Sequence, residues 1–393
     1  MSDFFIDIGF SQMQKHAQVI CGDVFLTRKV SEENRTIVVM SDGLGSGVKA
    51  NILASMTASM ALNFIAMNSP LAHTADIIMN TLPIDRERRI SFSSFTIIDI
   101  ESDGLVHIVE YGNPETICIR NGKPIELEKS EIKVENKYNL NQKLFHSNFK
   151  GQKEDRIVVC SDGVTQAGIG TAANPFGWSL KKTQRYVIDK IHQDPKISSY
   201  DLSKKILSKS LAIDSHKAKD DITAGTIYLR EPRKLMLCSG PPYHEEKDGQ
   251  LAFSLDNFAG KKVICGGTTA NIIARELKRD IETNITRFSG ALPPTSIIEN
   301  IDLVTEGILT IGKAHKQLEE GFQYTPSPKD PATELCNMFL EHDEIYFTVG
   351  TKVNEAHQDP ALPIELEIRR NVIKKIAQTL EDTYLKKTCI EYI

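Results

Sequence analysis

Four short segments each place an aspartate beside an apolar, strand-like run. An Asp at a strand end holds a hard oxygen ligand on a rigid support, and several such ligands at one point would bind Mg²⁺ or Mn²⁺. No His and Cys residues with the spacing of zinc ligands accompany them. The segments are Cys21-Gly22-Asp23, Ser41-Asp42-Gly43-Leu44-Gly45-Ser46-Gly47, Ser161-Asp162-Gly163 and Asp220-Asp221-Ile222-Thr223.

Each segment alone has a plainer explanation. Asp-Gly is foremost a turn dipeptide. The Gly-rich segment after Asp42 also fits a simple strand-to-helix connection, or an anion site at a helix N-terminus. It lacks the GK[ST] ending of a Walker A loop and fits the dinucleotide-binding fingerprint poorly. The metal hypothesis therefore depends on the four segments occurring together.

The order and spacing of the four segments resemble the SpoIIE-like bacterial branch of the metal-dependent type 2C serine/threonine protein phosphatases. That branch has Gly-Asp, then Ser/Ala-Asp-Gly-x-Gly-x-Gly opening a long helix, and far downstream Ser-Asp-Gly and Asp-Asp-x-Thr. Here Asp42 follows Asp23 by 19 residues, which fits the branch. The resemblance covers residues 1–230.

The resemblance implies a site with two Mn²⁺ or Mg²⁺ ions. Asp42 would bridge both ions, and Asp23 and the Gly43 carbonyl would serve one of them. Asp162 and Asp220 would serve the other, with Asp221 in a supporting role. Asp42 and Asp23 are the expected catalytic residues.

The implied reaction is hydrolysis of phosphoserine or phosphothreonine in a partner protein, by a water that the two ions activate and without a phosphoenzyme. Anti-anti-sigma-like proteins are candidate substrates by resemblance, although nothing in the residues selects them. Leu44 stands where eukaryotic members have a His, and Lys15-His16-Ala17-Gln18 lacks their phosphate-gripping Arg. Lys15 or His16 is the candidate substitute, and no residue is assigned as general acid.

The elements that would position these residues are strands mixed with a few long helices. Apolar residues at helical spacing, such as Ile52, Met56 and Met60, predict a helix over 48–67. Asn121-Gly122 predicts a tight hairpin. Grouped strands and helices indicate an α+β fold, and the resemblance implies two face-to-face antiparallel sheets with helices outside (α-β-β-α layers). The predicted strands are 37–40, 95–100, 106–111, 116–120 and 157–160, and the other helices 75–80, 181–191 and 199–212.

A charged, Pro-containing break at Arg230-Glu231-Pro232-Arg233 predicts two domains, 1–232 and 233–393. In the second, predicted strands alternate with helices, which favours a smaller α/β domain with a mostly parallel sheet. The predicted strands are 235–238, 262–265, 301–304 and 344–349, and the helices 269–279, 308–319, 331–341 and 363–385.

Small and hydroxyl residues follow several predicted strands of the second domain. In a parallel sheet, ligands bind at the carboxyl ends of strands beside helix N-termini, so we expect a site for a small anionic ligand and a sensing or regulatory role. Plain turns and helix caps explain the same residues equally well. The candidate ligand-binding residues are Gly266, Gly267, Thr268, Thr269, Thr305, Glu306 and Lys352.

Composition narrows the class of protein. The chain has 393 residues, a net charge of −5 and 25% charged residues, which argues against global disorder and against a protein devoted to nucleic acid. No apolar stretch is long enough to span a membrane, and the N-terminus does not resemble a signal peptide. Seven cysteines without a CxxC pair indicate a reduced, cytoplasmic protein.

Two alternatives to a protein phosphatase stay open. The chain could be a non-catalytic regulatory module that binds a metabolite or a protein partner through a degenerate phosphatase fold. It could also hydrolyse small phosphoesters with the same metals. The retention of all the expected Asp residues argues against the first alternative. The sequence does not indicate an oligomeric state.

Overall fold

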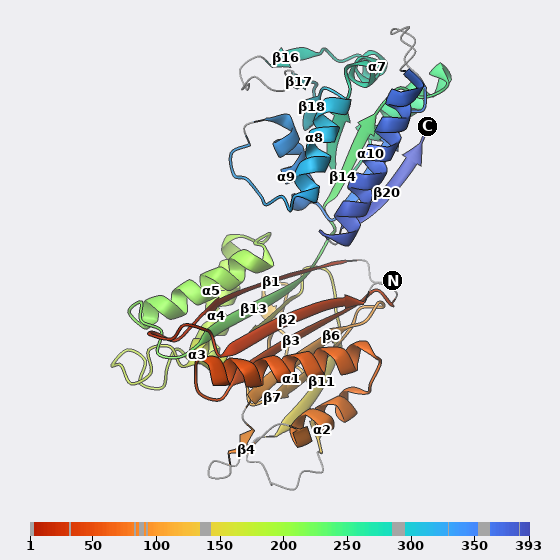
Figure 1. Cartoon of the computed structure of the whole chain (residues 1–393). Coiled ribbons are helices and arrows are strands. Elements are labelled where there is room, and N and C mark those ends of the chain that lie inside the picture. Colours follow the sequence, from red (N-terminus) through yellow and green to blue (C-terminus); the bar gives the residue numbers. More distant parts are fainter. Residues whose placement is uncertain are drawn as a thin grey trace. The chain divides into compact units, whose positions relative to one another are not determined.

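The computed structural model forms two compact units, Met1–Glu231 and Pro232–Ile393 (Figure 1). Their boundary lies within the charged segment Arg230-Glu231-Pro232-Arg233. The structure describes residues 4–30, 33–81, 84–85, 90–91, 93–133, 143–284, 295–328, 330–352, 362–384 and 386–393.

The first unit is built on two antiparallel sheets. One has the strand order β1-β13-β12-β8-β9, and the other β10-β11-β7-β6-β3-β2; β4 and β5 form a separate short ribbon. The strands are β1 (Phe5–Met13), β2 (Asp23–Val30), β3 (Arg35–Gly43), β4 (Ile84–Asp85), β5 (Ile90–Ser91), β6 (Ser93–Ile100), β7 (Leu105–Tyr111), β8 (Ile117–Arg120), β9 (Lys123–Pro124), β10 (Ser130–Ile132), β11 (Leu144–Lys150), β12 (Arg156–Cys160) and β13 (Ile222–Arg230).

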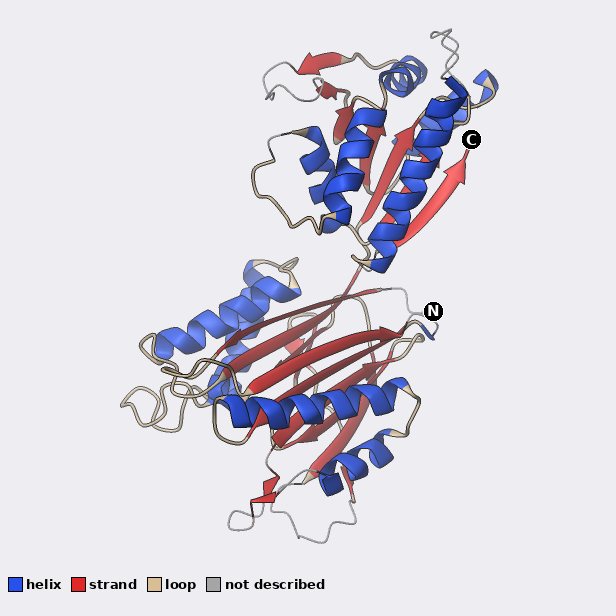
Figure 2. Cartoon of the chain, viewed as in Figure 1, coloured by secondary structure: helices blue, strands red, loops and turns tan. Residues whose placement is uncertain are grey.

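Helices cover the outer faces of both sheets, as Figures 1 and 2 show. Helices α1 and α2 pack with β3, β6 and β7, whereas α4 and α5 pack with β8, β12 and β13. The layers are therefore α-β-β-α, and the predicted fold class is confirmed. The helices are α1 (Val48–Ala66), α2 (Leu71–Thr81), α3 (Asp162–Thr165), α4 (Leu180–Gln193) and α5 (Ser199–Ile213).

The alternation of side chains along the strands creates three cores. In β3, Val38 and Met40 point into the space between the sheets, while Ile37 and Val39 point toward α1. Because both faces of β3 are covered, its apolar run shows no polar alternation. The Asn121-Gly122 turn joins β8 to β9 with both residues at positive φ, as a two-residue hairpin requires.

Helix α1 confirms the helix predicted over 48–67, but it presents two of its large apolar side chains to solvent: Ile52 is 53% exposed and Met56 is 48% exposed. The buried face consists mostly of small residues, including Ala50, Ala54 and Ala58, with Ile65 in the last turn. The small side chains let the helix backbone approach the sheet closely.

The second unit is a seven-stranded sheet of order β16-β17-β18-β15-β14-β19-β20, in which β18 through β20 are parallel neighbours. Helices α6 and α7 cover one face, and α8, α9 and α10 cover the other. Its elements are β14 (Lys234–Ser239), the 3₁₀ helix η2 (Glu245–Lys247), α6 (Asp248–Asp256), β15 (Lys261–Cys265), α7 (Gly267–Leu277), β16 (Glu282–Asn284), β17 (Thr295–Ile297), β18 (Leu303–Thr305), α8 (Ile308–Glu319), α9 (Pro331–Glu341), β19 (Glu344–Val349), α10 (Leu362–Asp382) and β20 (Lys387–Tyr392).

The cysteines and the helices show two properties of the described part of the chain. Each of the seven cysteines lies within the described residues, and all are free thiols. Burial raises the pKa of the Cys160 thiol to about 12, as expected for an inert core residue. Among the described residues, none of the helices combines the length and the apolar character that a membrane span needs.

The core between the sheets predicts a large cost for truncating Ile98, which is fully buried on β6. Ile98→Ala should lower the free energy of unfolding by about 2–5 kcal/mol, because a cavity remains where the side chain packed. Ile169→Ala is the matched control, since Ile169 is 43% exposed, and it should cost no more than about 0.5 kcal/mol. Urea unfolding followed by Trp178 fluorescence measures both, and equal costs would contradict the assigned core.

Candidate active site

The pairing of β2 with β3 brings the first two expected ligands together. Asp23 and Asp42 are directly opposite each other in the antiparallel register. Side chains at opposite positions have Cβ atoms about 4.5–5.5 Å apart, and like charges there destabilise a sheet. The pairing of Asp23 with Asp42 therefore adds no stability to the sheet by itself.

The other sheet delivers the remaining aspartates. Asp162 is the first residue of α3, one residue beyond the end of β12, and Asp220-Asp221 directly precede β13. A Cβ on Gly22 would lie 2.7 Å from the Asp221 Oδ2 atom, so the Asp221 carboxylate lies against the residue before Asp23. The two sheets thus meet at this end through their acidic segments.

Two glycines of the Asp-Gly pairs are required by close backbone contacts. A Cβ on Gly43 would collide with the carbonyl oxygen of Ala50 in α1, and a Cβ on Gly163 would collide with the carbonyl oxygen of Asp221. Each glycine therefore lets a second segment pass directly beside an expected ligand. The Asp-Gly motifs are packing contacts as well as turns.

A hydroxyl network fixes the orientation of Asp23. The Thr223 hydroxyl donates to Asp23 Oδ2 at 2.6 Å, and Gln12 Nε2 donates to the Thr223 hydroxyl at 3.1 Å. The Thr223 backbone N–H in turn donates to Ser161 Oγ at 2.9 Å. Thr223 and Ser161 belong to the sequence motifs, but their role in holding Asp23 was not predicted, and neither was Gln12.

Burial and mutual repulsion raise the pKa values of the central carboxyls. Burial raises the pKa of Asp23 to about 7, with the charges of Asp221 and Asp162 adding to the rise. Burial also raises the pKa of Asp42 well above its usual range, and Asp23, Asp162, Asp220 and Asp221 all add to it. The pKa of Asp162 is raised by burial and then by Asp220. The five carboxylates therefore share one electrostatic environment.

The site has hydrogen-bond acceptors without donors and little positive charge. Asp23 Oδ1 and Asp221 Oδ2 are buried without a hydrogen-bond partner. Lys15 Nζ lies 3.6 Å from Asp220 Oδ1, and the Lys15 backbone N–H donates to Asp221 Oδ1 at 2.9 Å. One half-exposed lysine does not neutralise five acidic groups. Buried oxygen atoms of this kind fit divalent cations such as Mg²⁺ or Mn²⁺.

The arrangement is not a finished coordination sphere. Within the described residues, no three His, Cys, Asp or Glu side chains converge so that they could hold a metal ion as they stand. Asp162 Oδ2 accepts a hydrogen bond from Gln166 Nε2 at 2.9 Å, and Asp220 Oδ1 accepts one from the Asp221 N–H at 3.0 Å. The set of metal ligands thus stays a prediction, although the segments that carry them meet at this edge. The predicted ligands are Asp23, Asp42, Gly43, Asp162 and Asp220.

The family assignment rests on the first unit. The family model described as Stage II sporulation protein E (SpoIIE) matches residues 32–230, which is half of the chain. The chain belongs to the SpoIIE family. The predicted membership is therefore confirmed, and the matched range contains Asp42, Asp162 and Asp220 with the elements that hold them. A SpoIIE-family chain is expected to be a phosphatase. None of the curated proteins searched matches this chain.

Solved structures similar to this SpoIIE-family chain include three phosphatase-type proteins. The phosphatase domain of the cell fate determinant SpoIIE from Bacillus subtilis is 12% identical, with 58% of this chain and 94% of that chain covered and a TM-score of 0.45. The S. agalactiae serine/threonine phosphatase is 12% identical (57% and 100% covered, TM-score 0.41). RsbX in complex with magnesium is 17% identical (57% and 95% covered, TM-score 0.39).

The predicted ligand residues of the second unit gather at one edge of its sheet. The parallel register aligns the ends of β15 and β18, and the Gly266 N–H donates to the Thr305 carbonyl oxygen at 2.9 Å. Gly266 and Gly307 precede α7 and α8 as N-cap residues, without a side-chain cap. A Cβ on Gly307 would lie 3.4 Å from Gly266 Cα, so the two helix N-termini adjoin.

The side chains at this edge are used in different ways. The Thr269 hydroxyl accepts from the Gly240 N–H at 2.9 Å, and the Thr305 hydroxyl donates to the Glu306 carbonyl oxygen at 2.9 Å. Glu306 Oε2 is buried without a partner, whereas Lys352 Nζ pairs with the Glu245 carboxylate at 2.8 Å. Thr268 and Gly267 begin α7. The anion site therefore stays a prediction, with Lys352 engaged elsewhere.

The close contact at Gly163 predicts the effect of a single methyl group. Gly163→Ala should lower the free energy of unfolding of the first unit by about 1–3 kcal/mol, because the methyl must displace the Asp221 backbone. Gly312→Ala in α8 is the control: its Cβ would meet nothing within 4 Å, and it should stabilise its helix by up to about 1 kcal/mol. Calorimetry of both variants tests this, and a neutral Gly163→Ala would contradict the packing described.

Proposed function

We propose that the chain is a metal-dependent serine/threonine protein phosphatase that hydrolyses phosphoserine or phosphothreonine in a partner protein. The observation that carries the proposal is the gathering of five mutually repelling aspartates, two of them with buried unpartnered oxygens, at the meeting edge of the two sheets. SpoIIE-family membership supports the same reaction class. The carboxylates of such a site repel one another, and the cations of a phosphatase metal centre would neutralise their charge.

Different residues of the site would bind the metal ions, orient a ligand and attract the phosphate. Asp42, Asp23 and the Gly43 carbonyl, with Asp162 and Asp220, would hold two Mn²⁺ or Mg²⁺ ions. Those cations supply the charge and Lewis acidity that activate a water for attack on phosphorus. The Thr223 hydroxyl holds Asp23 in one orientation, and Asp221 fastens the Lys15 backbone beside the site. The Lys15 ammonium, beside Asp220, is placed to attract the phosphate dianion.

Removing the central carboxylate tests the proposal. Asp42→Asn and Asp220→Ala should each lower Mn²⁺-dependent hydrolysis of p-nitrophenyl phosphate and phosphoserine peptides by about 100-fold or more, because charge stabilisation in the transition state is lost. The Asp103→Asn variant is the control, since Asp103 lies in the exposed turn between β6 and β7. It should retain wild-type turnover.

Calorimetry separates an inactive enzyme from a non-catalytic module. Titration of Mn²⁺ into the full chain should give saturable binding that is weakened in Asp42→Asn. Saturable Mn²⁺ binding with no turnover of either substrate class would contradict the phosphatase proposal. That result would favour the alternative of a regulatory module, whereas turnover of p-nitrophenyl phosphate alone would favour a small-phosphoester hydrolase.

For the second unit we propose a ligand-sensing or regulatory role, and for the whole chain a cytoplasmic location. The specific observation is the pair of adjoining helix N-termini at Gly266 and Gly307, beside the buried Thr269 and Thr305 hydroxyls. N–H groups there favour an anion. An anti-anti-sigma-like phosphoprotein is one candidate substrate for the first unit.

A thermal-shift measurement tests the second-unit proposal. Inorganic phosphate or nucleoside phosphates should raise the melting temperature of the full chain, because a ligand that binds only the folded state stabilises it. Gly266→Val, which places a branched side chain at a φ of 134° between the helix termini, should abolish the shift. Equal shifts in variant and wild type, or none in the wild type, would contradict an anion site at this edge.

A further inference from the structure

The helical layer of α4 and α5 carries a positive charge that the rest of the chain does not share. Residues 180–219 contain ten Lys and Arg against four Asp and Glu, whereas the whole chain has a net charge of −5. The basic residues are Lys181, Lys182, Arg185, Lys190, Lys196, Lys204, Lys205, Lys209, Lys217 and Lys219.

None of these ten cations forms an ion pair, and the whole of 180–219 lies within the described residues. Lys182 and Lys190 donate to amide oxygens, and Lys219 donates to a backbone carbonyl. Elsewhere in the same unit, exposed lysines such as Lys143 and Lys150 pair with carboxylates. The α4–α5 layer therefore keeps an excess of positive charge that no ion pair among the described residues offsets.

A groove of about 620 Å³ lies within this layer. Its lining includes Lys204, Lys205, Lys209 and Ser208 of α5 and Tyr186 of α4, together with two aspartates. Three ammonium groups beside a hydroxyl and an aromatic ring can receive carboxylate side chains together with small apolar ones. The groove thus has the size and chemistry for a peptide segment.

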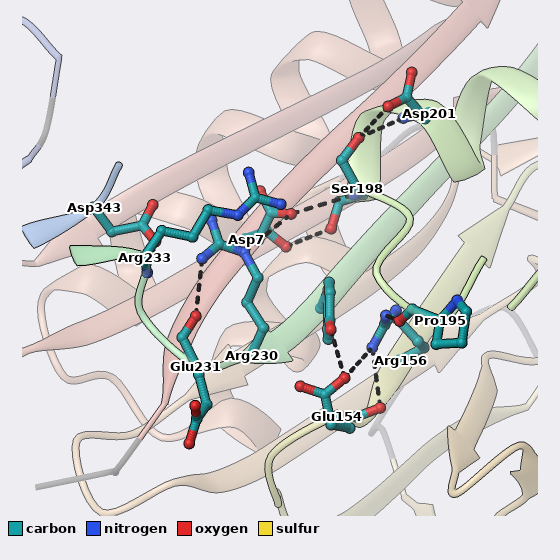
Figure 3. Close-up of polar contacts among 12 residues, drawn as sticks. Asp7, Glu154, Arg156, Pro195, Ser198, Asp201, Arg230, Glu231, Arg233 and Asp343 are labelled. Atoms are coloured by element: carbon teal, nitrogen blue, oxygen red, sulfur yellow. Dashed lines mark hydrogen bonds and ion pairs between the residues drawn. The ribbon is translucent and has the colours of Figure 1, made fainter. Parts of the chain in front are cut away.

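The groove has a rigid support, as Figure 3 shows for the start of α5. Arg156 Nη2, buried in the sheet, donates to the Pro195 carbonyl oxygen at 2.9 Å in the loop between the helices. The Ser198 hydroxyl accepts from the Asp201 N–H as the N-cap of α5 and donates to its carboxylate. The Ser199 hydroxyl donates to the Asp7 carbonyl oxygen. A partner would therefore meet a preformed surface.

The same helix leads to the metal-binding region. After α5, Asp214 accepts hydrogen bonds from the N–H groups of Gly168 and Lys219, which fixes the segment that runs into Asp220. Lys217 and Lys219 are exposed along this segment. The chain after α5 therefore carries two exposed lysines on its way to the aspartates.

We propose that the α4–α5 groove docks an acidic segment of the phosphoprotein that the site dephosphorylates. The inference rests on the proposed phosphatase function and adds the class of partner. The main apolar faces of both helices, with Val187, Leu202 and Ile206, are buried in the core, so the outer surface of the layer is mostly polar. Asp194 and Asp201 also line the groove, so its three lysines face two carboxylates, and the excess positive charge favours an acidic partner.

Fluorescence anisotropy tests the docking surface without relying on turnover. The probe is a short labelled peptide of alternating Glu, Asp and Ala, titrated with the full chain. Binding should be measurable at low salt and weaken as salt rises, because the contacts are between exposed charges. Changing Lys204, Lys205 and Lys209 together to Gln should weaken binding by about tenfold or more.

The control removes the same charge elsewhere. Lys29, Lys133 and Lys375 are exposed lysines outside the layer, and their combined change to Gln should leave peptide binding as in the wild type. Equal weakening in both triple variants would overturn the proposal, because net charge alone would then explain it. Retained binding in the groove variant would overturn it as well.

Two further probes distinguish the other occupants and the underlying function. Stronger, lysine-dependent binding of phosphatidylserine vesicles or single-stranded RNA than of the acidic peptide would overturn the proposal in favour of those partners. Acidic phosphoserine peptides should be hydrolysed with a higher kcat/KM than basic ones. Lysine-dependent peptide binding without any turnover would support the docking surface and count against the phosphatase activity alone.

Discussion

The mutual repulsion of five aspartates at the meeting edge of two sheets is the constraint on which the first unit depends. Asp23 and Asp42 are opposite each other in register, and among the described residues neither forms an ion pair with a cationic side chain. Burial raises the pKa of both carboxyls, which means that the folded chain resists carrying their charge. The fold keeps this arrangement because the inter-sheet core and the two helical layers hold the edge in place. Bound cations would turn a source of instability into the centre of the active site.

Small residues make the edge possible. Gly43 lets α1 approach Asp42, Gly163 lets the Asp221 backbone pass beside Asp162, and Gly22 makes room for the Asp221 side chain. The alanine face of α1 serves the same purpose along the sheet. Close backbone contacts therefore bring together segments far apart in sequence, and the side-chain hydrogen bond from Thr223 to Asp23 joins two of them across 200 residues. Outside the edge, the α4–α5 layer carries ten basic residues that form no ion pair among the described residues.

The sequence predicts the layers and the membership of the family because both depend on local signals. Apolar runs such as 37–40 mark strands buried on both faces, and helix 331–341 has the same limits in the structure, with Asp330 as its N-cap. Strands β1, β2 and β20 escape prediction because exposed or half-buried positions interrupt their apolar pattern. The apolar spacing predicted helix α1 but not which of its faces packs, since periodicity counts apolar residues and ignores how closely a helix can approach the sheet. The Thr223 contact with Asp23 depends on tertiary pairing, which no local pattern encodes.

The central claim is that positive charge at the aspartate edge stabilises the fold, and urea unfolding measures this directly. The single tryptophan, Trp178, is buried in the first unit, so its fluorescence follows that unit alone. The account predicts that Mn²⁺ at about 100 times its dissociation constant raises the free energy of unfolding by about 2.7 kcal/mol over the EDTA-treated chain. It also predicts that Asp42→Asn, without metal, is more stable than the wild type. Unfolding curves that are unchanged by Mn²⁺, together with a metal-free Asp42→Asn variant no more stable than the wild type, would contradict it.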